Sequence, residues 1–172
     1  FIEKAVKSAL FHEEVKEILI VNDGSTDNSL VIVEHLQQMD DRIKIYHHSN
    51  KINKGRSASR NLAIKNATQP FIAFLDADDF YLENRFDLDK KIFDNKAPVD
   101  GVYNAIGVHY YRKFTENEND ELSLTTVTEP IKPEELFYYL LNGQKGYFSI
   151  DGLTIKREVV SKIGYFQEQL IV

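Results

Sequence analysis

Short apolar runs alternate with helical patterns of apolar residues through the first hundred residues of this chain. The predicted strands cover 17–22, 42–47 and 71–75, and the predicted helices cover 1–14, 29–39, 57–67 and 85–95. Strands that alternate with helices of about ten residues favour a mostly parallel sheet with right-handed crossovers. We therefore expect an α/β fold. We also expect that a first strand before Phe1 is missing, because the first helix otherwise has no strand from which to cross over.

The regular alternation stops near residue 100. The later pattern predicts a long strand over 101–111, a helix over 133–141, a strand-like segment over 148–156 and a short helix over 157–163. No repeat, low-complexity tract or clear linker separates the two parts. We therefore expect one domain over 1–172, with a nucleotide-binding half over 1–100 and a second half over 101–172 that shapes another pocket.

The composition is that of an ordinary globular protein, with 42% hydrophobic and 28% charged residues. A net charge of -6 argues against a nucleic-acid-binding surface, which is usually basic. The chain has no cysteine, so it forms no disulfide and no thiolate metal site, which is compatible with the cytoplasm. No apolar run approaches the roughly 20 residues that span a bilayer.

Three carboxylates, those of Asp76, Asp78 and Asp79, directly follow the apolar run Phe71–Leu75. So short an apolar run is typical of a strand buried on both faces, and ligands bind at the carboxyl ends of such strands in open α/β sheets. Carboxylate oxygens suit Mg²⁺ or Mn²⁺, which keep other positions for water and substrate phosphates. The alternative is a loop whose aspartates cap the next helix. The buried strand before the cluster favours the metal site.

Asp23 ends an earlier predicted strand, so it would lie on the same edge of the sheet. Its carboxylate either accepts hydrogen bonds from a base or ribose, or bonds the backbone of its own turn. Taken alone, the second role is the more common one.

A basic group lies before and within the helix that leads to the acidic strand. It comprises Lys54, Gly55, Arg56 and Arg60. Cations near the start of a helix oppose its macrodipole, so anion binding explains them better than helix stability does. The alternative is a solvated polar face. Asn61, next in the helix, either bonds across the site or lies on the surface.

Four segments of the chain resemble motifs of the family 2 glycosyltransferases. They are Ile18–Asp27, Asn53–Asn61, Leu75–Asp79, which is similar to the family's DxD motif, and Thr154–Phe166. Together, in this order and at compatible spacing, they cover most of the chain.

The resemblance implies a GT-A fold and transfer of a sugar from a nucleoside diphosphate sugar, which we expect to be UDP-linked, to an acceptor hydroxyl with inversion. Carried over by position, Asp23 would bind the nucleobase and Lys54–Arg60 would flank the base and the diphosphate. Asp76 and Ala77 would contact the donor near the ribose. Asp78, with Asp76, would ligate Mn²⁺ or Mg²⁺.

The acceptor would be a saccharide or a lipid-linked sugar of a cell-surface polysaccharide or glycoconjugate, and Asp151 is the candidate for contact with it. The implied location is the cytoplasm, either free or at the inner face of the membrane. The family's base usually lies in a Glu-Asp pair beyond the last matched segment. No such pair precedes Val172, and neither Asp151 nor Glu168 matches it, so no base is assigned. Two alternatives stay open: a domain that binds nucleotide sugar without turnover, and a haloacid-dehalogenase-like phosphatase.

Overall fold

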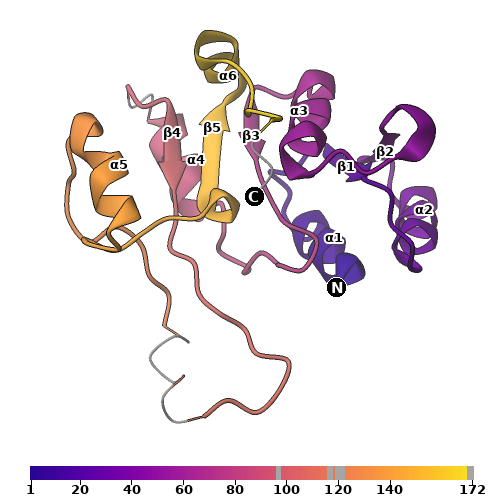
Figure 1. Ribbon diagram of the computed structural model, residues 1–172, viewed down its shortest axis with the longest axis horizontal. Coiled ribbons are helices and arrows are strands. Elements are labelled where there is room, and N and C mark those ends of the chain that lie inside the picture. The colour runs from indigo at the N-terminus through magenta and orange to yellow at the C-terminus, as the bar shows by residue number, and fades with distance from the viewer. Residues whose placement is uncertain (96–97, 116–117, 119–122, 170–172) are drawn as a thin grey trace.

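The computed structural model describes residues 1–95, 98–115, 118 and 123–169, which form two small sheets with helices around them (Figure 1). The helices are α1 (Ile2–Leu10), α2 (Ser29–Met39), α3 (Arg56–Asn66), α4 (Asp87–Asp94), α5 (Pro133–Leu141) and α6 (Arg157–Ile163), with 3₁₀ turns η1 (Ser49–Lys51) and η3 (Ile150–Gly152). The strands are β1 (Ile18–Asn22), β2 (Ile43–His47), β3 (Phe71–Ala73), β4 (Gly101–Tyr103) and β5 (Leu153–Lys156). Within the described ranges, every helix is too short or too polar to cross a bilayer.

The first sheet consists of β1 and β2, which pair in parallel from Ile18 opposite Ile43 to Asn22 opposite His47. Apolar residues recur every three or four positions in α1 and α2, so each helix presents an apolar face to this sheet. The buried side chains at the centre of this layer are those of Val6, Val33, Leu36 and Ile43. The order of helices and strands predicted for this part of the chain is confirmed.

The second sheet has the order β3-β5-β4, and β5 is antiparallel to both neighbours. Tyr103 at the end of β4 pairs with Leu153 at the start of β5, because η3 returns the chain to the end of the sheet at which β4 finishes. The α/β class is confirmed. Among the described strands, however, parallel pairing joins only β1 and β2, whereas the sequence predicted it through most of the sheet.

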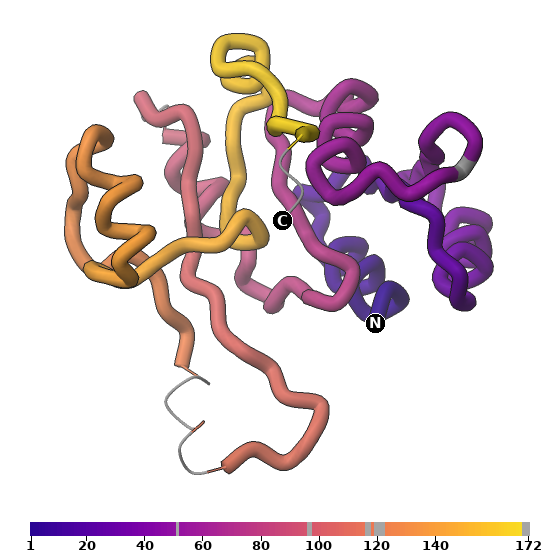
Figure 2. The backbone as a smooth tube through the Cα atoms, viewed as in Figure 1, coloured from indigo at the N-terminus to yellow at the C-terminus, as the bar shows by residue number. Residues whose placement is uncertain are grey.

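The strand predicted over 101–111 is wrong in length. Strand β4 covers only its first three residues, and beyond it one isolated bridge joins Ile106 to Thr125. Aromatic and β-branched residues raise the propensity for a strand but do not supply a neighbouring strand. The neighbour, β5, begins only where η3 ends, so residues 104–115 lead away from the sheet, as the coral part of the tube in Figure 2 shows.

The strand over 71–75 is also shorter than predicted, and it is not buried on both faces. Phe71 is 40% exposed, and its ring lies 4.4 Å from that of Phe93 in α4. Ile72 and Phe74 are buried against α3 and α6, in a core that includes Ile64. Side chains therefore alternate between the solvent and the core along β3 and the residue after it, as expected for a strand with one face covered by helices.

A cavity of about 740 Å³ lies between the two sheets. Its apolar walls come from β1, β3 and the inner faces of α1 and α3. The end where β1 and β3 finish, called here its polar end, carries Asp23 and Asp76, and further charged residues such as Glu17 line the cavity elsewhere. The strand expected before Phe1 is outside this chain, and that expectation stays a prediction.

Candidate functional site

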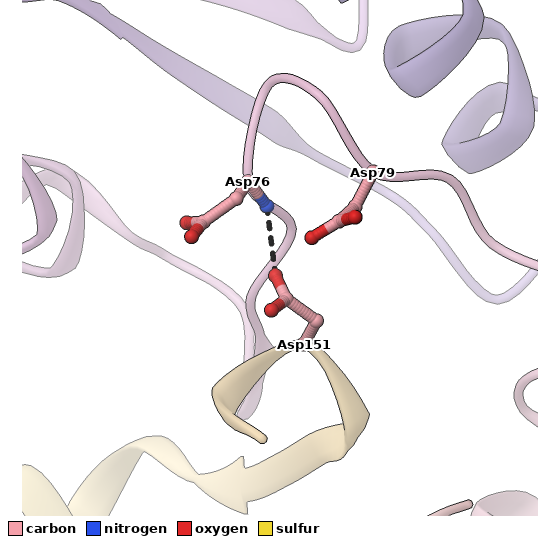
Figure 3. A group of neighbouring side chains, drawn as sticks. All are labelled: Asp76, Asp79 and Asp151. Atoms are coloured by element: carbon pink, nitrogen blue, oxygen red, sulfur yellow. Dashed lines mark hydrogen bonds between the residues drawn. The ribbon is translucent and has the colours of Figure 1, made fainter. Parts of the chain in front are cut away.

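The acidic loop after β3 brings carboxylates from both halves of the chain together. Among the described residues, Asp76, Asp79 and Asp151 each offer an oxygen atom within 4.8 Å of the other two. In Figure 3, Asp151 approaches Asp76 and Asp79 from the η3 turn. The backbone N–H of Asp76 donates to Asp151 Oδ1 at 2.8 Å, and Asp79 N–H closes the loop on the Asp76 carbonyl at 3.1 Å.

The η3 turn fixes Asp151 in this place. Ser149 caps the turn, and its hydroxyl donates to Asp151 Oδ2 at 2.9 Å. Gly152 packs so closely on the neighbouring chain that a Cβ atom would lie 2.6 Å from the Asn104 carbonyl oxygen. A larger residue at position 152 would therefore move the turn away from β4, and Asp151 with it.

The acidic loop itself is anchored by Tyr81. Its hydroxyl donates to the Phe74 carbonyl at 2.6 Å, and its backbone N–H donates to the Ser8 hydroxyl at 2.9 Å. Burial raises the pKa of Tyr81, so its phenol stays protonated and remains a donor. The residues between Phe74 and Tyr81 are therefore held at both ends of the loop.

The electrostatics of this cluster favour a cation. Burial, followed by the negative charges of Asp151 and Asp78, raises the pKa of Asp79. Arg60 donates to Asp76 Oδ1 at 2.7 Å. A set of three carboxylates fits a hard divalent cation such as Mg²⁺ or Mn²⁺, because oxygen ligands are what these ions prefer.

Asp78, the metal ligand expected from the DxD resemblance, does not belong to this group of three, although it is exposed just as Asp79 is. Asp79 occupies the group in its stead. The family resemblance named Asp78 and Asp76 as the metal ligands, gave Asp79 no ligand role, and placed Asp151 on the acceptor. Only the fold, which brings η3 beside the end of β3, joins these two residues to Asp76.

Asp23 holds a loop that lies far from it in the sequence. Its Oδ1 accepts from the Lys54 backbone N–H at 2.7 Å, and its Oδ2 accepts from the Gly55 N–H at 2.8 Å. Gly55 has a φ of +85°, which a residue with a side chain rarely adopts, just before α3 begins. His48 Nε2 lies 3.5 Å from Asp23 Oδ1. The carboxylate therefore does not bond its own turn, which is the alternative role weighed from the sequence.

One cavity connects most of the donor-binding candidates. Its polar end is lined by Asp23, Arg56, Arg60, Asp76 and Ala77. Lys54 and Gly55 join this group through their hydrogen bonds to Asp23. Side chains separated by as many as 54 positions in the sequence thus face one space between β1, α3 and β3.

Asn61 is buried, with 1% of its surface exposed, and it bonds Phe166 and Glu168 rather than lying on the surface. A signal for this was present, because Ala58, Asn61 and Ile64 recur at helical spacing and share the buried face of α3. The C-terminal part of the described chain is thereby fastened to the helix that carries Arg60.

Comparisons with known proteins identify the family of this chain. A model of the family described as Glycosyl transferase family 2 matches residues 1–164. An uncharacterized glycosyltransferase of Haemophilus influenzae is 26% identical over 151 residues, which are 87% of this chain and 54% of that protein.

Solved structures share the fold. S. aureus TarS 1-349 has a TM-score of 0.70 at 22% identity, over 100% of this chain and 48% of that one, and it has also been solved with UDP-GlcNAc. Mannosyltransferase PcManGT from Pyrobaculum calidifontis, solved with GDP-Man and Mn²⁺, has a TM-score of 0.62 at 15% identity, over 98% of this chain and 44% of that one.

The chain spans about half the length of these proteins. The likeness in structure confirms the GT-A-like α/β fold expected from the four motifs. Because the family model covers residues 1–164 of 172, the chain belongs to glycosyl transferase family 2.

Proposed function

We propose that this chain binds the donor of a glycosyltransferase that moves a sugar from a nucleoside diphosphate sugar to an acceptor hydroxyl with inversion. The observation that carries the proposal is the single cavity lined by Asp23, Arg56, Arg60, Asp76 and Ala77. A nucleotide needs hydrogen-bond acceptors for its base and cations for its diphosphate, and this cavity offers both.

Arg56 and Arg60 are the cations for the diphosphate. A guanidinium group stays charged and can donate two parallel hydrogen bonds to phosphate oxygens. Arg60 is already oriented by its bond to Asp76, so less conformational freedom is lost when the phosphate binds. Asp23, which lines the same cavity, holds the Lys54–Gly55 backbone through two hydrogen bonds.

The metal site of this proposal is the group of Asp76, Asp79 and Asp151, in place of the Asp76–Asp78 pair suggested by the DxD motif. A bound Mn²⁺ or Mg²⁺ would neutralise the charge that develops on the diphosphate leaving group. Asp151 is assigned to this site rather than to the acceptor, because it offers an oxygen within 4.8 Å of oxygens of both Asp76 and Asp79, in a position held by Asp76 N–H and the Ser149 hydroxyl.

We propose UDP as the nucleotide, with support from the TarS complex with UDP-GlcNAc. The PcManGT complex with GDP-Man has a similar fold, so the fold alone does not choose the base. The acceptor of the proposal is a saccharide or a lipid-linked sugar, and the place of action is the cytoplasm or the inner face of the membrane. Family membership gives no support to the phosphatase alternative.

Calorimetric titration with UDP, UDP-GlcNAc and GDP-Man, with and without Mn²⁺, tests the proposal. We expect binding of the uridine nucleotides that is tightened by Mn²⁺, and weaker binding of GDP-Man. Asp41→Asn, which alters an exposed carboxylate away from the cavity, is the control and should bind like the parent. Absence of binding by all three nucleotides contradicts the proposal. Binding without sugar transfer to any saccharide or lipid-linked acceptor supports the alternative of a binding domain without turnover.

A further inference from the structure

We propose that Asn61 is a positioning residue, which holds Arg60 in place for the diphosphate by fastening the segment 165–168 over it. This inference rests on the proposed function, because it concerns the same donor site. Asn61 Nδ2 donates to the Phe166 carbonyl at 2.9 Å and to Glu168 Oε1 at 2.8 Å, and its Oδ1 accepts from the Phe166 N–H at 2.9 Å.

Two of these bonds fix the backbone of Phe166 through both its N–H and its carbonyl, and the third holds the Glu168 side chain. A carboxamide offers two N–H hydrogens and an acceptor oxygen, so it can pair with the N–H and the carbonyl of one residue as a neighbouring strand does. Alanine can make neither bond, and aspartate lacks the donors. The bonds join residues 105 positions apart, and Figure 2 shows the yellow end of the tube beside α3.

Phe166 connects the bonds made by Asn61 with Arg60 in the donor site. Its ring lies edge-on to Phe74 with 5.9 Å between the ring centroids, and the Arg60 guanidinium carbon lies 5.9 Å from the Phe166 ring centroid. Arg60 reaches from there to Asp76 Oδ1 at 2.7 Å, with only 19% of its side chain exposed. The aromatic ring therefore shields Arg60 from water on one side, and the charge of a guanidinium acts more strongly where water is excluded.

A chain of contacts thus runs from Asn61 through Phe166 to Arg60. If Asn61 acts on the nucleotide only through Arg60, removal of Asn61 should matter only while Arg60 is present. A general structural role for Asn61 would instead weaken binding whether Arg60 is present or not. This difference is what a double-mutant cycle measures.

The test is calorimetric titration of the parent, Asn61→Ala, Arg60→Ala and the double variant with UDP in the presence of Mn²⁺. We expect each single variant to raise the dissociation constant about tenfold, and the double variant to raise it no further than Arg60→Ala alone. Additive losses, about a hundredfold in the double variant, overturn the proposal. An unchanged constant in Asn61→Ala also overturns it. A parent that binds no UDP overturns the proposed function instead.

Asn66→Ala is the matched control, because it removes an asparagine of the same helix whose side chain bonds the Leu62 carbonyl and, among the described residues, no part of the segment 165–168. It should leave the dissociation constant unchanged, and a loss like that of Asn61→Ala would overturn the proposal. If Asn61→Ala does not fold, Phe166→Leu replaces it, since that variant keeps the backbone bonds and removes the ring that contacts Arg60 and Phe74. We expect its loss to vanish in the Arg60→Ala background, and persistence of the loss there overturns the proposal.

Discussion

The backbone N–H of Asp76 donates a hydrogen bond to the carboxylate of Asp151, with 2.8 Å between the nitrogen and Oδ1 (Figure 3). The bond connects the end of β3 with the turn before β5, two places 75 residues apart in the sequence. It therefore brings a carboxylate from the second half of the chain to the acidic loop of the first half. The resulting concentration of negative charge is costly unless a cation offsets it.

Asp151→Asn tests whether the charge at this position serves a metal. The Asn oxygen can still accept from Asp76 N–H, so the turn should keep its place while one negative charge is lost. We expect the affinity for Mn²⁺ in the presence of UDP to fall at least roughly tenfold. Calorimetric titration with Mn²⁺ measures this, with Asp41→Asn as the control for loss of a remote charge. An unchanged Mn²⁺ affinity would remove Asp151 from the metal site.

The variants Asp78→Asn and Asp79→Asn test whether the metal is bound by the carboxylates that the structure groups together or by those that the DxD motif suggests. Asp79 belongs to the group of three carboxylates and Asp78 does not. We expect Asp79→Asn to weaken Mn²⁺ binding at least roughly tenfold and Asp78→Asn to weaken it less than about threefold. The same Mn²⁺ titration compares them. The opposite ranking would favour Asp78 as the ligand.

The pH dependence of stability gives a second test of Asp79. Burial, then the charges of Asp151 and Asp78, raise the pKa of Asp79 above its ordinary value of 3.8. The folded state therefore holds this proton more tightly than the unfolded state, and stability is lost as the pH rises through the raised pKa.

Asp79→Asn lacks this loss. Its melting temperature relative to that of the parent should thus be higher near neutral pH than below pH 3.8. Thermal unfolding without metal at both pH values measures the difference, and Mn²⁺ should stabilise the parent near neutral pH. A difference that does not change with pH contradicts the raised pKa of Asp79 in the folded state.

Much of the first half could be predicted from the sequence because its signals are local. The periods of apolar residues gave helix 29–39 and the strands around Ile20 and Ile45, and these agree with α2, β1 and β2. The long strand over 101–111 was wrong because the length of a strand depends on its neighbour. That neighbour, β5, is distant in the sequence and is limited by η3.

In the candidate site, too, the features that depend on local signals could be predicted from the sequence, and those that depend on distant contacts could not. Asp76 and Arg60 could be named from a strand end and a helix start, and they meet in the structure. Asp151 could not be placed beside Asp76 in advance, because its position depends on the return of the chain through η3 and on the close approach at Gly152. For Asn61 the sequence left open a bond across the site and a surface position, and its place on the buried face of α3 excludes the second.

Asp23→Asn tests the role of the carboxylate that holds the loop before α3. An amide has one acceptor oxygen, so it can keep only one of the two bonds to Lys54 and Gly55 N–H. We expect a loss of about 1 kcal/mol in the free energy of unfolding, measured with urea, and a UDP affinity that falls roughly tenfold because the loop loosens. Asp27→Asn is the control in the same turn, since its oxygen can still accept from Ser29 N–H. Equal effects of the two variants would contradict a special role for Asp23.

A buried ion pair stabilises the part of the fold that carries the acidic cluster. Arg85 and Asp89 meet at 2.8 Å, with 7% and 4% of their side chains exposed, and Arg85 also donates to the Thr154 hydroxyl of β5. Asp89 accepts from Asn104 as well, so the pair joins α4 to the ends of β4 and β5. Removal of one partner leaves the other charge buried and unpaired, which is more costly than the loss of the pair's attraction alone.

We therefore expect Asp89→Ala to lower the free energy of unfolding by about 3–5 kcal/mol, whereas the double variant Arg85→Met/Asp89→Leu should lose less than this single variant. Urea unfolding without nucleotide or metal compares them, so that ligand binding does not add to the stability. The comparison is sharp because the double variant removes more hydrogen bonds than the single one. If it is nevertheless the more stable of the two, the cost of Asp89→Ala comes from the unpaired guanidinium. If the double variant is the less stable, the hydrogen bonds to Asn104 and Thr154 outweigh the charge.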